Sequence, residues 1–289
     1  MIPAMVGEAA GIPHGHRNHD SSWCGYRIAV HFGSNEMISH LSYSAISTWL
    51  SCPENFRRRY VEKQATTTTP ALLFGTAFHG TVEQYLVDRN RSLIDVWPEQ
   101  WGAAVEREPD CEWGADTPEQ YHNDGIRLVS TPDVVKMIDA IKLRHDDDGP
   151  MVERKLELRV PGVPVPVIGY MDIMTSDGVP GDFKTSSYAW SQDKAKAELQ
   201  PAFYLAALNQ MGHTVPGLRF RHYVVTKGKQ PKAQVFEHQR TWGEILWLYE
   251  LIQRVWDAIE KEVYPLNPSG WLCSPKYCNW WSECRGRGV

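Results

Sequence analysis

The sequence predicts one α/β domain in which helical segments surround a run of strands. Three observations predict this class. The hydrophobic pattern changes from a helical period to strict alternation near residue 150, the alternating segments are joined by a short turn, and the ordered pattern from residue 41 onward contains neither a repeat nor a low-complexity linker. A chain of 289 residues with 42% apolar residues is long enough to bury a sizeable core. One α/β domain with a helical insertion fits best.

The N-terminal part of the chain is expected to differ from the rest. Residues 1–36 are rich in Gly, His and Ser without a clear period, which predicts a flexible extension before a single domain at residues 37–289. This stretch has no basic segment followed by an apolar core, and no apolar run reaches the length of a membrane span. We therefore expect no membrane partner and a reducing, cytoplasmic location, which is the host cytoplasm if the chain is phage-encoded.

The first half of the domain is predicted to be helical. Ser42 or Ser44 can cap a helix that runs to Tyr60, and Cys52-Pro53 inside it predicts a break into two helices. A second helix is expected from about Gly75. Residues 93–150 read as a helical insertion, with a helical start, a loop-rich middle and a further helix from about Pro132 to His145.

The second half is predicted to alternate strands and helices. A turn at Ser176-Asp177-Gly178 separates two of the strands. The expected elements are strands at Val152–Val160, Val165–Met174 and Val179–Thr185, a helix at Ser191–Gln210, a hairpin formed by Leu218–Thr226 and Ala233–His238, and a last helix at Thr241–Val263.

The short turn at residues 176–178 predicts a functional patch. It pairs residues whose numbers sum to about 354, so Asp172 lies across from Asp182 or its neighbour, and Lys184 shares the face of Asp182. Two carboxylates this close repel each other unless a cation lies between them, and a hard divalent ion is the natural occupant. Such an ion beside a lysine suits phosphodiester hydrolysis. A surface ion pair is the alternative.

A second acidic-x-Lys pattern serves as an internal comparison. Glu153-Arg154-Lys155 lies on the alternating strand, where Glu157 and Arg159 continue the charged positions. We expect these charged side chains to form a solvated face, without a role in the site.

The motifs around the patch are similar to those of a known family. Gly169-Tyr170-Met171-Asp172 and Gly181-Asp182-Phe183-Lys184 resemble motifs II and III of the PD-(D/E)XK nuclease superfamily. Further matches resemble its RecB-like branch, which includes the CRISPR-associated exonucleases of the fourth Cas family, and a phage homologue is compatible with them. These matches are Leu41-Ser42-Tyr43-Ser44 through Cys52-Pro53 to Arg59-Tyr60, the histidine motif Gly75-Thr76-Ala77-Phe78-His79-Gly80 to Glu83, and Gln200-Pro201-Ala202-Phe203-Tyr204.

The resemblance implies a fold and an activity. The fold would be a restriction-endonuclease-like core, that is, a mixed central sheet flanked by helices, with a helical N-terminal part and a C-terminal cysteine cluster. The activity would be a metal-dependent DNA exonuclease acting on single-stranded ends, in recombination, repair or phage DNA metabolism. A structure-specific or nicking endonuclease and an inactive DNA-binding scaffold are the alternatives.

The resemblance also implies roles for individual residues. His79, Asp172 and Asp182 would hold Mg²⁺ or Mn²⁺ together with the carbonyl of Phe183, and Lys184 would be the catalytic lysine. Gln200 and Tyr204 are one helical turn apart and would position the DNA or Lys184. For His79 the alternative is an ordinary helix residue, and for Tyr204 it is a place in the core. Glu83 would orient His79 or lie at the surface.

The cysteines predict a second site. Cys273, Cys278 and Cys284 come together in the tail at residues 271–289, and Cys52 at the helix break is the candidate for a fourth ligand. The RecB-like branch carries a 4Fe–4S cluster on one cysteine before the nuclease motifs and three after them, which implies the same cofactor here. Zinc and free structural thiols are the alternatives. Cys24 and Cys111 are read as ordinary thiols.

DNA is the expected partner, although the net charge of −5 argues against a protein that coats nucleic acid with its whole surface and leaves room for a local basic groove. Two basic runs are candidates for phosphate contacts or, equally, for solvated faces: Arg57, Arg58 and Arg59, and Lys227, Lys229 and Lys232. The sequence contains no G-x-x-x-x-G-K-[ST] motif, so any ATP-driven unwinding would come from a helicase or recombination partner. The sequence predicts no particular oligomeric state.

Overall fold

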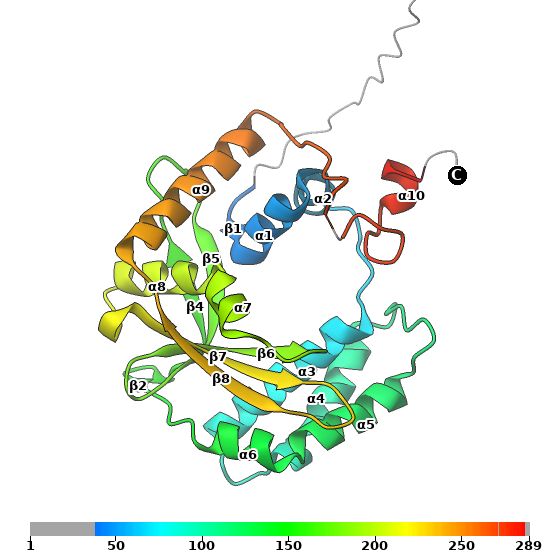
Figure 1. The fold of residues 1–289 in the computed structure, drawn as a ribbon, viewed down its shortest axis with the longest axis vertical. Coiled ribbons are helices and arrows are strands. Elements are labelled where there is room, and N and C mark those ends of the chain that lie inside the picture. The colour runs from blue at the N-terminus through cyan, green and yellow to red at the C-terminus, as the bar shows by residue number, and fades with distance from the viewer. Residues whose placement is uncertain (1–37, 271, 287–289) are drawn as a thin grey trace, which may run out of the picture. The chain divides into compact units, whose positions relative to one another are not determined.

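The computed structural model describes residues 38–270 and 272–286 (Figure 1). The extension predicted for residues 1–36, with Cys24, lies outside them. The helices of the first half are α1 (Tyr43–Ser51), α2 (Pro53–Phe56), the π-helix η1 (Arg57–Val61), α3 (Pro70–Val87), α4 (Leu93–Arg107), α5 (Pro118–Val129) and α6 (Pro132–Asp139). Those of the second half are α7 (Gln192–Ala197), α8 (Gln200–Gln210), the 3-10 helix η2 (Pro216–Leu218), α9 (Trp242–Glu260) and α10 (Trp281–Cys284).

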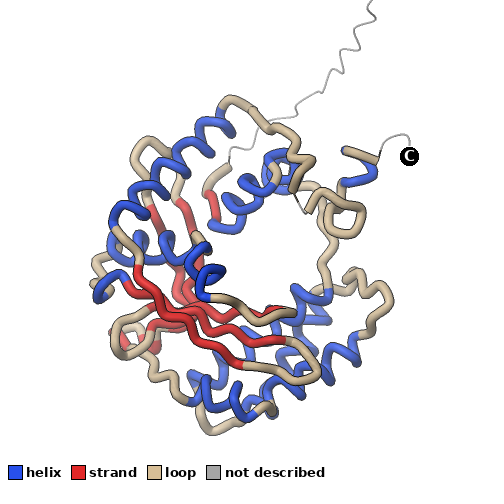
Figure 2. The backbone as a smooth tube through the Cα atoms, viewed as in Figure 1, coloured by secondary structure: helices blue, strands red, loops and turns tan. Residues whose placement is uncertain are grey.

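The central sheet, red in Figure 2, contains both parallel and antiparallel pairs. Its strands are β1 (Leu41–Ser42), β4 (Val152–Leu158), β5 (Val167–Met174), β6 (Pro180–Ser186), β7 (Arg219–Thr226) and β8 (Ala233–Gln239). The order is β1-β5-β6-β7-β8, and β4 also pairs with β5. The β1–β5 and β6–β7 pairs are parallel and the others antiparallel. A separate small hairpin joins β2 (His145–Asp146) and β3 (Gly149–Pro150).

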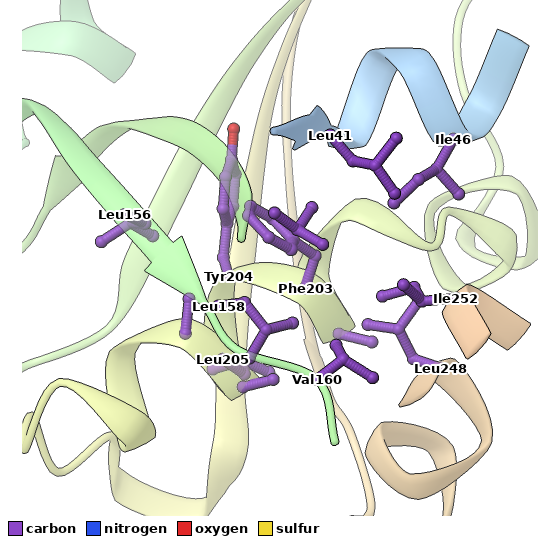
Figure 3. Close-up of a cluster of buried hydrophobic side chains, with 14 of the residues drawn as sticks. Leu41, Ile46, Leu156, Leu158, Val160, Phe203, Tyr204, Leu205, Leu248 and Ile252 are labelled. Carbon is purple, nitrogen blue, oxygen red and sulfur yellow. The ribbon is translucent and has the colours of Figure 1, made fainter. Parts of the chain in front are cut away.

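Helices cover the sheet on both faces, and each layer has its own core. Figure 1 shows α1, α8 and α9 on one side and α3 to α6 on the other. In the first layer Phe203 and Leu205 of α8 pack with Leu248 and Ile252 of α9 and with Leu158 of β4 (Figure 3). This arrangement is the predicted one, a mixed sheet between helices in a restriction-endonuclease-like fold.

In the second core Trp97 lies fully buried, and its ring is tilted by 53° to that of Phe74, with the two ring centroids 5.2 Å apart. Gly125 of α5 is needed there, because a Cβ atom at that position would lie 1.8 Å from the Trp97 ring.

Most of the predicted elements are present, and three differ in length. Strands β4 to β8, the break at Cys52-Pro53 and the last helix are confirmed. The second helix begins at Pro70, five residues before Gly75, because Thr69 before it is extended and proline is well suited to a first helical position. The helix expected at Ser191–Gln210 is two helices that separate at Glu198, whose backbone is extended. Pro201 has no N–H to donate to the preceding turn, so it suits the first turn of a new helix and not the interior of a continuous one.

The helix expected at Pro132–His145 ends at Asp139. The chain after it follows the sheet: the Arg144 N–H donates to the Met174 carbonyl, and Leu143 bridges to Thr175. Pairing with the end of β5 satisfies backbone groups that a longer helix would otherwise have bonded internally. None of the helices in the described ranges is long and apolar enough to cross a bilayer.

Candidate active site

The centre of the site is the point where β5 and β6 separate. Their ladder contains only the pairs Ile173–Gly181 and Met174–Pro180, so the next residues in register are Asp172 and Asp182. Beyond the ladder, the Phe183 N–H donates to Oδ2 of Asp172 at 2.6 Å and not to the backbone of β5. The two carboxylates are 7% and 1% exposed. The turn thus places them opposite each other, with the register that the sequence predicts.

Lys184 is held by two partners. Its Nζ lies 2.8 Å from Oδ2 of Asp182 and donates to Oε1 of Gln200 at 2.7 Å. Gln200 in turn donates to the Tyr204 hydroxyl at 2.7 Å, and that hydroxyl donates to the Tyr170 carbonyl at 2.6 Å. Tyr204 is 3% exposed, so it acts on the site through Gln200 and is also part of the core, as one interpretation of the sequence had it.

The charges of this group affect one another. Burial lowers the pKa of Lys184, but Asp182 outweighs burial and the net shift is upward, so the ammonium keeps its proton. Burial, together with the charge of Asp172, raises the pKa of Asp182 to about 6 against the effect of Lys184. Asp172 is shifted the other way, because His79 and the Phe183 N–H outweigh its burial and lower its pKa.

His79 reaches the site from α3. Its Nδ1 lies 3.4 Å from Oδ2 of Asp172, and its ring packs edge-on against Phe183. Burial lowers the pKa of His79, but the charge and hydrogen bond of Asp172 outweigh burial and raise the pKa to about 9. Glu83, one turn along α3, is half-buried, and burial and Asp172 raise its pKa. His79 is therefore part of the site and not an isolated helix histidine.

Glu153 is the residue that sequence reasoning missed. It was expected on a solvated face, but its backbone adopts φ +46° and it lies in register with Asp172, between the pairs Val152–Ile173 and Arg154–Met171. One ligand atom each of His79, Glu153 and Asp172 lie within 4.8 Å of one another, a group that does not include Asp182. Burial and then Asp172 raise the pKa of Glu153 to about 7.

Sequence reasoning had no register to apply to Glu153. The connection from β4 to β5 spans residues 159–166, so, unlike the tight turn at residues 176–178, it does not fix which residues pair. The observed register, in which the numbers of paired residues sum to 325, places Glu153 opposite Asp172.

The four predicted cysteine ligands meet in the fold. Cys52, at the start of α2, lines a cavity of about 180 Å³ together with Cys273, Cys278 and Cys284. Burial first, and then the other three thiols, raise the pKa of Cys278. In the described ranges no three of these sulfur atoms lie within 4.8 Å of one another, whereas tetrahedral zinc would hold them about 3.8 Å apart. Cys111 is buried elsewhere, in the core around α4.

Arg57 and Arg58 form ion pairs beside the cavity that the cysteines line. Arg57 pairs with Glu54 and Glu62, and Arg58, 7% exposed, lies between Glu54 at 2.8 Å and Glu283 of α10 at 2.7 Å. The Arg58 guanidinium is therefore not a solvated surface charge, and the interpretation of Arg58 as part of a solvated face is wrong. Arg57 is partly exposed and Arg59 is exposed, so for these two residues a phosphate contact stays a prediction.

The three lysines of the β7–β8 hairpin differ in exposure. The Lys227 ammonium lies 5.2 Å above the Phe74 ring, and burial lowers its pKa. Lys229 and Lys232 are exposed.

Fold and site together define a class of protein, a hydrolase that cleaves nucleic acid. A mixed sheet presents two buried carboxylates and a protonated lysine where two strands part, with an imidazole and a further carboxylate beside them. A sequence profile of the PD-(D/E)XK nuclease superfamily matches residues 40–285. The chain belongs to this superfamily, which makes it a nuclease and implies DNA as its substrate.

Comparison with solved structures agrees on the fold. The crystal structure of a candidate exonuclease from Eubacterium rectale is similar with a TM-score of 0.58 and 12% identity, over 86% of this chain and 88% of that one. At this identity the likeness shows the fold alone. The structure of SSO0001 is also similar, with a TM-score of 0.33 and 14% identity over 59% of this chain and 79% of that one, too low for an argument. No curated protein matches the chain in sequence.

Proposed function

We propose that the protein is a metal-dependent DNA exonuclease that acts on single-stranded ends. One observation carries the proposal: the buried pair Asp172 and Asp182 faces a lysine that keeps its proton. In the proposed site His79, Asp172 and Asp182 hold Mg²⁺ or Mn²⁺ with the carbonyl of Phe183.

The donor set fits such a cation. Carboxylate oxygens are the ligands that hard divalent ions prefer, and one imidazole among them favours Mn²⁺ slightly over Mg²⁺. The three carboxylates of Asp172, Asp182 and Glu153 face two protein cations, Lys184 and His79, which leaves one negative charge without a counterion. Such charge is costly in a buried site unless a cation offsets it.

The residues of the site have separable roles in hydrolysis. When bound, a divalent cation lowers the pKa of a water ligand and offsets charge on the phosphate. Lys184 keeps its ammonium beside the carboxylates, where it stabilises the negative charge that develops on the phosphate oxygens. Gln200 fixes the direction of that ammonium, and Tyr204 fixes the amide of Gln200. Asp172 is aligned by the Phe183 N–H.

We further propose that Cys52, Cys273, Cys278 and Cys284 hold a 4Fe–4S cluster with a structural role. Thiols that line one cavity yet stand farther apart than zinc requires support a larger inorganic group. The cluster would join α2 to the C-terminal tail, beside the ion pair of the buried Arg58 with the exposed Glu283. Zinc remains the competing occupant, and metal analysis of the purified protein distinguishes iron and sulfide from zinc.

The experiment for the activity compares two substrates. The protein is incubated with end-labelled linear and with circular single-stranded DNA, in Mn²⁺, in Mg²⁺ and in EDTA. Digestion of linear but not circular DNA, abolished by EDTA, is the expected result. Cutting of both substrates would identify an endonuclease instead, and binding without cutting would identify a scaffold. We propose a role in recombination, repair or phage DNA metabolism, with strand separation by a helicase partner, and the test of that role is a search for the partner protein.

A further inference from the structure

Glu153 reaches the site from a strand that carries none of the other proposed ligands. Asp172 lies on β5, Asp182 on β6 and His79 on α3, while Glu153 comes from β4, on the other side of β5. Asp172 therefore has a carboxylate facing it from each neighbouring strand. A row of three acidic residues across three adjacent strands is repulsive by itself.

The backbone at Glu153 is held in an uncommon conformation. Its φ of +46° lies in the left-handed region, which costs a non-glycine residue about 1 kcal/mol or more. The ladder continues on both sides, through Val152–Ile173 and Arg154–Met171, so the register stays unchanged. The conformation allows the carboxylate to stand among His79 and Asp172, whereas Arg154 next to it bonds to Asp146 in the small hairpin.

Among the described residues Glu153 forms no ion pair with a lysine or arginine, and His79, whose charge lowers the pKa of Glu153, is also paired with Asp172. Among the ion pairs between described residues, those near the site join Lys184 to Asp182 and His79 to Asp172, and none includes Glu153. Glu157, the other glutamate of β4, forms an ion pair with Arg159 in which nitrogen and oxygen lie 2.7 Å apart. One carboxylate of the strand thus has a protein counterion, and the other lies within 4.8 Å of an imidazole and a second carboxylate.

We infer that Glu153 is a ligand of the divalent cation, contributed by β4 and acting together with His79 and Asp172. The inference rests on the proposed metal dependence and extends its ligand set to a third strand. One nitrogen and two carboxylate oxygens within 4.8 Å of one another form a donor group suited to Mn²⁺ or Mg²⁺. Asp182, outside this group and held by Lys184, would bind from the opposite side of Asp172.

The test measures metal binding and does not depend on cleavage. Mn²⁺ is titrated into the full chain by calorimetry, and the Mn²⁺-induced rise in Tm is recorded, for the wild type, Glu153→Gln and Glu157→Gln. The last is a matched control on the same strand. We expect Glu153→Gln to weaken Mn²⁺ binding by about tenfold to a hundredfold, and Glu157→Gln to bind as the wild type does. Without Mn²⁺, Glu153→Gln should be at least as stable as the wild type, because it removes one charge from a repulsive group.

The outcomes separate this inference from the proposed function. Equal Mn²⁺ affinity in the wild type and Glu153→Gln would overturn the role of Glu153 and leave the nuclease proposal standing. Absence of Mn²⁺ and Mg²⁺ binding in the wild type would overturn the proposed metal dependence itself. If Glu153→Gln does not fold, Glu153→Asp replaces it: withdrawing the carboxylate by one methylene must also weaken Mn²⁺ binding, and unchanged affinity again overturns the inference.

Discussion

The amide of Gln200 joins Lys184 to Tyr204. Its oxygen accepts from the Lys184 ammonium at 2.7 Å, and its nitrogen donates to the Tyr204 hydroxyl at 2.7 Å. Because that hydroxyl donates onward to the Tyr170 carbonyl, only one orientation of the amide satisfies all three bonds. The direction of the lysine is therefore set by the first two turns of α8.

Gln200→Ala should lower kcat while it leaves the KM for DNA nearly unchanged. The variant removes a partner that positions Lys184 but leaves the Asp182 ion pair, so we expect a loss of about tenfold to a hundredfold. Steady-state digestion of labelled single-stranded DNA measures both constants. Gln210→Ala is the matched control on the same helix, because Gln210 bonds only to the backbone of Arg159. A rise in KM with unchanged kcat would instead assign Gln200 to DNA binding.

Asp182→Ala and Lys184→Ala should each abolish cutting while the fold is retained. Loss of the charge that stabilises the transition state costs at least about 10²-fold to 10³-fold in rate. Cleavage assays measure the effect, and far-UV circular dichroism checks the fold. Lys155→Ala, in the other acidic-x-Lys pattern, is exposed and should cut normally. Retained activity in the Asp182 or the Lys184 variant would refute the site.

The parts of the site that could be predicted are those fixed by local geometry. A three-residue turn leaves one register for β5 and β6, so the facing of Asp172 and Asp182 follows from the positions of Gly178 and its neighbours. The strand period then places Lys184 with Asp182. The approach of His79 and Gln200 from two helices follows from no spacing in the chain, and only the resemblance to a known family pointed to them.

The parts that could not be predicted depend on tertiary contacts and backbone conformation. Alternation along β4 assigns Glu153 to a charged face, because a periodic pattern carries no information on a φ of +46°. The run Arg57 to Arg59 reads as a basic surface in the sequence. The partner of Arg58 is Glu283, which lies 225 residues away, and no local pattern indicates that pairing. The end of α6 at Asp139 is likewise decided by pairing with β5.

Cys278→Ala should remove the proposed cluster and destabilise the protein. The group would close a loop of about 220 residues between Cys52 and Cys273, and closure of so long a loop contributes roughly 5 kcal/mol. Since a change of 1 kcal/mol in the free energy of unfolding shifts the Tm of a chain this size by about 2 to 4 °C, we expect Tm to fall by about 10 °C or more. Visible absorption, iron content and thermal unfolding measure the change.

Cys111→Ala is the control for the cysteine experiment. Cys111 is buried in the second core and takes no part in the cavity, so its variant should keep the iron and the visible absorption. Full iron content in the Cys278 variant would contradict the ligand assignment. Zinc in place of iron in the wild type would assign the same four thiols to the alternative metal.

The buried pair His222 and His238 should make the protein sensitive to acid. Nδ1 of His222 lies 3.2 Å from Nε2 of His238, and the remaining nitrogen of each ring lacks a protein partner among the described residues. Burial, and then His238, lowers the pKa of His222 to about 3, while burial, and then Arg240, lowers the pKa of His238 to about 4. Both imidazoles are therefore neutral in the native state at pH 5.

The sign of the effect follows from proton uptake. Below the ordinary pKa of 6.5 the unfolded chain binds protons that the native chain excludes, so the free energy of unfolding falls as pH falls from 6.5 towards 4 and 3. At pH 5 each imidazole accounts for a loss of about 2 kcal/mol. Urea denaturation at constant ionic strength should show this slope, and the double variant His222→Gln/His238→Gln, which cannot titrate at these positions, should have a flatter one. His213→Gln, at a partly exposed position after α8, should keep the wild-type slope. If the double variant also kept it, the buried pair would not be the source of the acid sensitivity.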